Sequence, residues 1–247
     1  MRISVIVLGT ALLMIAYECT RPGRRWPQVA GWWLRAALLN GVQAGAVLLA
    51  GITWDRWFVT YRLWSADGLG VTGGAVVGYV AITFVYYWWH RWRHTSAVLW
   101  RWLHQVHHSP QRIEVITSFY KHPLEIVANS VLSSAIVYFV VGAGPAAATY
   151  AVLLTGLAEL FYHWNVATPY WLGYLIQRPE SHCVHHQEGV HSYNYADLPL
   201  WDMLFGTFYN PRRWEARCGF GADKEHRLWD MLRGMDVNET AATGGVA

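Results

Sequence analysis

The sequence predicts an all-α fold: a multi-pass bundle of four or five membrane-spanning helices with a helical cytosolic cap. Of its 247 residues, 54% are hydrophobic and only 14% are charged, whereas a soluble domain carries about 25% charged residues. Apolar runs of bilayer length recur along the first two thirds of the chain, and the last third has none. A soluble helical bundle is disfavoured because it would lack the charge to cover its surface.

Five apolar segments approach the roughly 17–25 residues that a helix needs to cross a bilayer. They are residues 3–17, 28–53, 69–89, 126–143 and 146–162. The first segment is the weakest candidate for a membrane-spanning helix. Only Arg2 precedes it and no small-x-small cleavage site follows, so we expect a retained helix rather than a signal sequence.

Most basic residues follow the first, third and fifth segments, only Arg56 and Arg62 follow the second, and the loop between the fourth and fifth has none. Because Arg and Lys are enriched in cytoplasmic loops, we expect an integral, multi-pass membrane protein with its histidine motifs on the cytoplasmic face. Nearly all basic residues are Arg; Lys121 and Lys224 are the only lysines. This bias is typical of a GC-rich bacterial genome and favours the bacterial inner membrane.

We interpret the chain as a single membrane domain. Residues 1–163 hold the spanning helices and the first two histidine motifs, residues 164–237 form the cap with the third, and residues 238–247 are a flexible tail. Two GxxxG pairs, Gly41/Gly45 and Gly74/Gly78, indicate close helix packing.

Histidine is the unusual residue of this composition, with 12 copies crowded into short motifs. One HxxxH motif and two HxxHH motifs contain His90, His94, His104, His107, His108, His182, His185 and His186. Spacings of three and four put side chains on one helical face, so each motif is expected to aim two or three imidazoles at one point. Neutral imidazole binds Fe, Zn, Cu and Ni. Eight imidazoles exceed what one ion holds with a reactive position open, so two ions are implied.

Other polar residues are candidates by position. His163 ends the fifth segment, with Glu159 one turn earlier; Glu159 could bind metal, support a ligating imidazole, or pair with a basic side chain. His122 precedes Pro123 and Glu125, a pattern that a helix N-terminus explains.

Asn194 and Asp202 in the cap are candidate partners for imidazole N–H groups. Asp202 could equally hold the cap together through an arginine. His191 and His226 are not expected to be ligands.

The composition also excludes some classes. The net charge of +3 offers no basic stripe for nucleic acid. The three cysteines lie far apart and give neither a disulfide framework nor a CxxC site.

The ordered motifs resemble the fatty acid hydroxylase/sterol desaturase superfamily of integral-membrane di-iron enzymes. The likeness runs from about residue 90 to 208, roughly half of the chain. It rests on the strings HRWRH (90–94), LHQVHHS (103–109), FYKHPLE (119–125), FYHWN (161–165) and RPESHCVHHQEGVHSYNYADLPLWDMLFGTF (178–208).

The resemblance implies two iron ions held by histidine and no catalytic side chain beyond the metal ligands. The implied ligands are His90, His94, His104, His107, His108, His163, His182, His185 and His186. Some relatives carry a further histidine where this chain has Ala167. One iron would then be completed by His122, Asn165, water or an oxidant.

The resemblance also implies hydroxylation or desaturation of a lipid that enters from the bilayer, with O₂ as co-substrate. No electron-transfer domain is fused, so we expect a separate donor protein of the ferredoxin, rubredoxin or cytochrome b5 type. Zinc could replace iron in purified protein.

Two other hypotheses remain open at this point. A zinc-dependent membrane lipid hydrolase would need an acid–base carboxylate, such as Glu159 or Glu188. A metal or haem carrier would need ligands distributed along a transmembrane path.

Overall fold

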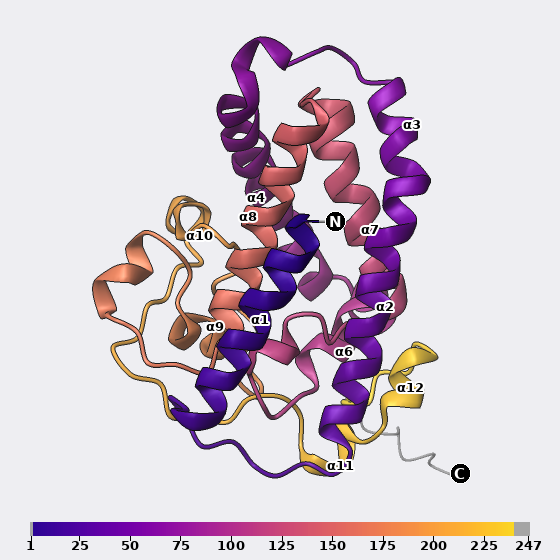
Figure 1. The fold of residues 1–247 in the computed structure, drawn as a ribbon. Coiled ribbons are helices and arrows are strands. Elements are labelled where there is room, and N and C mark those ends of the chain that lie inside the picture. Colours follow the sequence, from indigo (N-terminus) through magenta and orange to yellow (C-terminus); the bar gives the residue numbers. More distant parts are fainter. Residues whose placement is uncertain (1, 240–247) are drawn as a thin grey trace.

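The computed structural model describes residues 2–239, which form helices and loops without a β-strand (Figure 1). The part of the expected flexible tail beyond residue 239 lies outside the described residues. Within them, four stretches are long and apolar enough to cross a membrane, as expected for an all-α multi-pass bundle. These are Trp32–Thr60, Asp67–Thr95, Pro123–Val140 and Pro145–His163.

Each long stretch is built from one or two helices. The first joins α2 (Trp32–Ile52) to α3 (Trp54–Thr60), the second η1 (Asp67–Leu69) to α4 (Gly70–Thr95), and the third α7 (Pro123–Ser134) to the π-helical η4 (Ala135–Val140). The fourth is α8 (Pro145–His163). The expected helix at 3–17 is α1 (Arg2–Thr20), in which Ile6–Thr20 forms a shorter apolar helix than the four candidate spans.

The helix ends differ from the expected boundaries for local reasons. The second apolar segment begins its helix only at Trp32, because Gly31 at the N-cap has a φ of 66° that ends the preceding loop. Pro123 and Pro145 occupy the first turns of α7 and α8, where the missing proline N–H costs no hydrogen bond. The third helix continues to Thr95, so His90 and His94 lie on α4 itself.

Close packing of α4 on α8 confirms one of the two GxxxG predictions. A Cβ on Gly74 would lie 2.9 Å from Ala147 Cβ, and one on Gly78 would lie 3.0 Å from Ala151 Cβ. The same prediction for Gly41 and Gly45 is wrong within the described chain. Both are exposed, and a Cβ added to either would meet nothing within 4 Å, because this face of α2 points outward.

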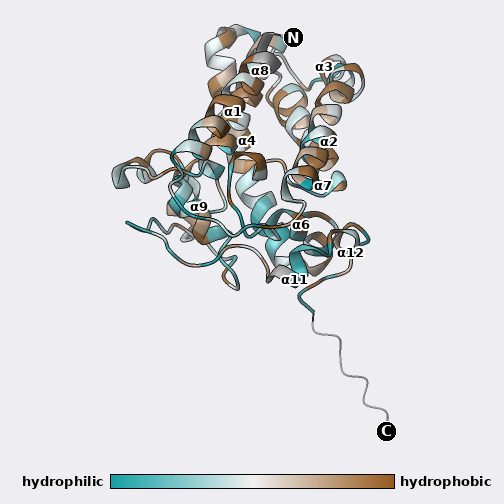
Figure 2. Ribbon diagram, turned by 60° about the horizontal axis from the view of Figure 1, so that its bottom comes forward, coloured by the Kyte–Doolittle hydropathy of each residue, from teal (hydrophilic) through white to brown (hydrophobic). Residues whose placement is uncertain are grey.

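The remaining helices lie toward one end of the bundle, with α10 beside α4. Between α4 and α7 run α5 (Ala97–Leu99), the π-helical η2 (Trp100–His104), α6 (Gln105–His108) and η3 (Val115–Thr117). After α8 come η5 (Tyr170–Tyr174), α9 (Pro179–His185), α10 (Pro199–Phe205), α11 (Ala222–Glu225) and α12 (Leu228–Leu232). Figure 2 shows the spanning helices largely in hydrophobic colours and hydrophilic segments gathered around α6 and α9.

The cap is tied directly to the bundle. α9 packs on α8, α10 on α4, and α12 on α6. The cap helices therefore lie against the helices that carry His90, His94 and His163. This arrangement brings together histidine motifs that are far apart in the chain.

Candidate metal centre

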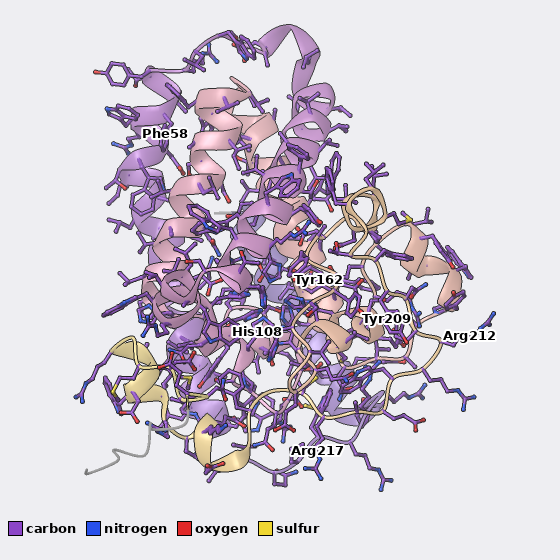
Figure 3. The ribbon with its side chains drawn as sticks, turned by 180° about the vertical axis from the view of Figure 1, so that it is seen from behind. Phe58, His108, Tyr162, Tyr209, Arg212 and Arg217 are labelled. Carbon is purple, nitrogen blue, oxygen red and sulfur yellow. The ribbon has the colours of Figure 1, made fainter. Side chains whose placement is uncertain are left out.

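Nine histidines meet where the spanning helices join the cap, and Figure 3 shows His108 in this interior. They form two groups, and within each group one ligand atom per residue lies within 4.8 Å of all the others. Group one contains His90, His94, His104, His108 and His185. Group two contains His107, His163, His182 and His186.

Four chain segments supply these rings. The end of α4 carries His90 and His94, and the end of α8 carries His163. The η2–α6 segment carries one HxxHH motif, and α9 with its C-cap residue His186 carries the other. The π-helical turn in η2 is a feature that often marks functional sites.

Each motif aims two rings at one group, as expected, but the third ring of each HxxHH motif belongs to the other group. His104 and His108 belong to group one, whereas His107 belongs to group two. In the other motif, His182 and His186 belong to group two and His185 to group one. Residues four apart share a helical face, but neighbouring residues point about 100° apart. One motif can therefore serve two centres.

The ring nitrogens that face the middle of each group lie close to one another, and no hydrogen-bond acceptor of the described chain lies between them to account for this closeness. In group two, His182 Nε2 lies 3.0 Å from His163 Nε2 and 3.0 Å from His186 Nε2. Two nitrogens bound to one ion at about 2.1 Å lie about 3.0–3.4 Å apart. The observed spacing therefore fits nitrogens that share a metal ion.

Group one shows the same feature. His104 Nε2 and His108 Nε2 lie 3.2 Å apart. The Nε2 atoms of His90, His94 and His185 are buried with no hydrogen-bond partner among the described residues. Buried polar atoms are normally satisfied, so these three nitrogens also fit a metal ion.

Four of the outer ring nitrogens are held by backbone carbonyl oxygens. His90 Nδ1 lies 2.7 Å from Tyr195 O, His185 Nδ1 2.7 Å from Tyr193 O, His163 Nδ1 2.9 Å from Glu159 O and His107 Nδ1 3.3 Å from Tyr120 O. A carbonyl oxygen can only accept, so each Nδ1 carries the hydrogen. Each Nε2 then presents its lone pair, which is the tautomer that a metal requires.

One imidazole is held by a buried carboxylate that the sequence interpretation missed. His104 Nδ1 lies 3.1 Å from Glu125 Oε1, and Arg93 pairs with the same carboxylate. Glu125 was assigned only to the positive end of a helix. A carboxylate in the first turn of an apolar helix, close in the chain to a histidine motif, was the available signal for this role.

Burial keeps the rings uncharged. It lowers the pKa of His185 to about 3, and it lowers the pKa values of His104, His107 and His108 well below their usual range. The same holds for His182 and His186. These imidazoles are neutral at pH 7, as metal binding needs.

The two groups are in direct contact. His108 of group one stacks on His186 of group two, with ring centroids 4.3 Å apart and planes 18° from parallel. Metal ions held by the two groups would therefore be neighbours rather than independent sites.

Two of the further candidates lie outside both groups. His122 is the N-cap of α7, where its Nδ1 accepts a hydrogen bond from Leu124 N at 3.0 Å. Asn165 bridges to the first loop, accepting from Arg24 N and donating to Arg24 O, both at 2.9 Å. Both residues hold the fold.

Glu159 and Asp202, which also lie outside both groups, act on imidazoles through backbone carbonyls. The Glu159 carboxylate pairs with Lys121, while the Glu159 carbonyl accepts from His163. Asp202 accepts from Tyr195 N at 2.8 Å and Ala196 N at 2.9 Å, and so places the carbonyl that holds His90. No salt bridge joins Asp202 to an arginine among the described residues.

Asn194 and His191 shape the loop after α9. Asn194, with a φ of 56°, donates to Ser181 O at 2.8 Å. His191 was not expected at the centre, and it belongs to neither group. Its Nδ1 nevertheless lies 3.1 Å from His108 Nδ1, so it supports a group-one ring.

Comparison with known proteins identifies the family. Residues 75–207, more than half of the chain, match the model of the fatty acid hydroxylase family. The chain therefore belongs to this family, and the predicted resemblance is confirmed. Together with the four apolar helices, this identifies an integral membrane protein.

Several curated proteins are similar to the chain. Human alkylglycerol monooxygenase is 30% identical over 53% of this chain and 29% of its own length. Ornithine lipid hydroxylase OlsE of Rhizobium tropici is 32% identical over 56% of this chain and 42% of its own. Sphingolipid C4-hydroxylase sur2 of Schizosaccharomyces pombe is 25% identical over 51% of this chain and 44% of its own length. The chain thus spans less than half of these relatives, and no solved structure matches it significantly.

Proposed function

We propose that this protein is a membrane-bound di-iron oxygenase that hydroxylates, or desaturates, an unactivated C–H position of a lipid. The observation that carries the proposal is the pair of adjoining histidine groups, in which seven of the nine rings are buried. The names of the relatives, which include lipid hydroxylases and a monooxygenase, support a lipid substrate such as a fatty acyl chain or a sterol.

All nine grouped histidines are proposed as iron ligands. Two bound iron ions would supply the activation of O₂ and the removal of hydrogen from carbon. The protein holds the rings in the required tautomer through Tyr195, Tyr193, Glu159 and Tyr120 carbonyls and through Glu125. Burial excludes bulk water from the rings, which protects a reactive centre from side reactions.

The electrons are proposed to come from a separate donor protein of the ferredoxin, rubredoxin or cytochrome b5 type. A cavity of about 530 Å³ opens beside α9, lined in part by Arg24, Arg25, Arg212 and Arg213. Glu180 at the start of α9 also lines it, two residues before His182. An acidic donor fits this basic face, and donor binding should weaken as salt is raised.

The basic residues also support the proposed orientation. Arg-rich segments lie at the cap end of the bundle, where the histidine groups lie. By the positive-inside tendency, this end faces the cytoplasm, in a bacterial inner membrane.

The alternative hypotheses gain less support. A zinc hydrolase needs a free carboxylate at the metal, but Glu159 is paired with Lys121, and neither Glu159 nor Glu188 belongs to a histidine group. A carrier needs ligands along a transmembrane path, whereas the nine rings gather where the ends of α4 and α8 meet the cap.

The deciding experiment combines metal analysis with oxygen dependence. Purified protein should contain about two iron ions per chain, with zinc as a possible replacement, and should convert lipid under air but not under argon. Lipid mass spectrometry of cells with and without the gene should show one lipid class that gains one oxygen or loses two hydrogens. Turnover under argon with zinc bound would support the hydrolase instead.

A further inference from the structure

We propose that α10 and η5 of the cap lie in the membrane interface, where lipid acyl chains cover their exposed apolar side chains. The inference rests on the packing and composition of the cap and is independent of the chemistry at the histidines. The surface concerned, called the lipid-facing patch below, consists of Trp171, Tyr174, Leu175, Leu200, Met203, Leu204 and Phe205, which are 37–62% exposed.

The composition of the patch is unlike that of a water-exposed surface. No charged residue occurs in 169–176, and Asp202 is the only one in 198–209. The Asp202 side chain is turned inward and is 1% exposed. A few residues further on, Arg212, Arg213, Glu215 and Arg217 are all exposed. The cap therefore has one apolar side and one charged side, and contiguous apolar patches of this kind mark membrane or protein contacts.

The position of α10 selects the membrane. Trp201 Nε1 donates to Thr83 Oγ1 at 3.0 Å, and the Trp201 ring lies 5.0 Å from that of Phe84. Figures 1 and 3 both show α10 beside α4 rather than beyond its end. Thr83 lies 12 residues before Thr95, the last residue of α4, which is about 18 Å along the helix.

This depth places α10 within the bilayer boundary. α4 has 26 residues, or about 39 Å of helix against a hydrocarbon core of about 30 Å. Even if all the excess length projects on the cap side, Thr83 lies inside the core. Phe205 packs on Trp88 at 4.8 Å, and Trp88 and Trp92 are exposed on the same helix. Exposed tryptophans of this kind belong at the interface.

An interfacial helix buries its apolar face about 5–10 Å into the boundary of headgroups and acyl chains. The patch satisfies this description: its exposed side chains are apolar, its one carboxylate points away from lipid, and it continues the apolar outer surface of α4. A second copy of the chain or another protein is the competing occupant of the same surface.

A labelling experiment distinguishes these occupants. Cys19 is the exposed native cysteine, whereas Cys183 and Cys218 are buried, so C19S provides the background. Leu204→Cys reports on the patch, with Met203→Cys as a second reporter in case the first variant folds poorly. Glu215→Cys is the matched control on the charged side of the cap. Each variant is labelled with an environment-sensitive fluorophore and reconstituted in phosphatidylcholine nanodiscs at one chain per disc.

Phosphatidylcholine brominated on its acyl chains should quench the Leu204 and Met203 labels several-fold more than the Glu215 label, and aqueous iodide should show the opposite order. Equal quenching of all three labels by iodide would place the patch in water and overturn the proposal. Labels shielded from both quenchers would mean that protein covers the patch, which also overturns it. Neither readout depends on bound metal or turnover, so this test and that of the oxygenase can fail separately.

Discussion

The two histidine groups are built on one plan but differ by one ring. Each takes two residues four apart from one HxxHH motif and a single residue from the other motif. Group one adds His90 and His94 from the end of α4, whereas group two adds only His163 from the end of α8. Where a second histidine would follow four residues later, the chain has Ala167. We expect group two to leave more of its ion open.

The groups also differ in how their rings are held. Group one uses a side-chain network, because Glu125 and Arg93 reach His104 from two different helices. Both groups also use two backbone carbonyls each. Group two adds the Gln177 amide, 3.0 Å from His182 Nδ1, but no charged side chain bonds to its rings among the described residues. Substitution of Glu125 or Arg93 should therefore weaken metal binding in group one and leave metal binding in group two unchanged.

The largest effect is expected from removing a ligand. His185→Ala should lower turnover on the order of 100-fold or more and reduce iron from about two ions to about one, because group one loses a ring that no neighbour replaces. Metal analysis and a turnover assay measure this. His226→Ala, at an exposed histidine outside both groups, is the control. Full activity of His185→Ala would refute the ligand assignment.

The next effect tests the side-chain network. Glu125→Gln should weaken metal binding in group one by about 10–100-fold, because the ring of His104 loses a charged acceptor and Arg93 loses its partner. Chelator titration followed by iron analysis should show one ion released early. Glu159→Gln removes a carboxylate that pairs with Lys121 rather than with a ring, and it should leave both ions bound. Equal losses from both variants would contradict the proposed difference between the groups.

A smaller effect is expected at the helix cap. His122→Ala should lower the stability of the protein by about 1 kcal/mol, because α7 loses its N-cap acceptor, while iron content stays unchanged. Thermal unfolding in detergent and metal analysis measure the two quantities. His122→Asn retains a capping acceptor and should recover the stability. Loss of iron from His122→Ala would instead make His122 a ligand.

The smallest effect on metal binding is expected at Ala167, the position where some relatives carry a further histidine. Ala167→His should change iron content and chelator resistance by no more than about a factor of three. The helix α8 ends at His163 and Trp164 is extended, so residue 167 does not continue the face that carries His163. Chelator-release kinetics compare the variant with the parent chain. Marked tightening of one ion would show that group two lacks only this ring.

Local patterns predicted much of this protein. Hydropathy located the four long apolar helices to within several residues, because burial of an apolar run in lipid is a property of that run alone. Helical spacing singled out eight of the nine histidines that the structure gathers, and His163 was a candidate by its position at the end of an apolar segment. The close packing at Gly74 and Gly78 was also predictable from the sequence, since small residues four apart permit close approach of a neighbouring helix.

Other features depended on partners distant in the chain. The role of the Glu125 carboxylate could be recognised only from the structure, in which α7 packs beside α4 and places this carboxylate against His104. Gly41 and Gly45 carried the same pattern as the other glycine pair, yet no helix of the described chain packs on them. A sequence pattern shows which contacts a segment is able to make, and the position of the neighbouring helices determines whether these contacts form.

By itself, the sequence determined that this protein is helical, rich in bilayer-length segments and equipped with histidine motifs that suit metal ions. These properties follow from periodicity and transfer energy, which act within a few turns of chain. Only the tertiary structure decided how each motif is divided between two adjoining groups and how α10 comes to lie beside the middle of α4. These outcomes depend on the relative rotation and depth of helices, which are set by packing between residues as far apart as Thr83 and Trp201, 118 positions in the chain.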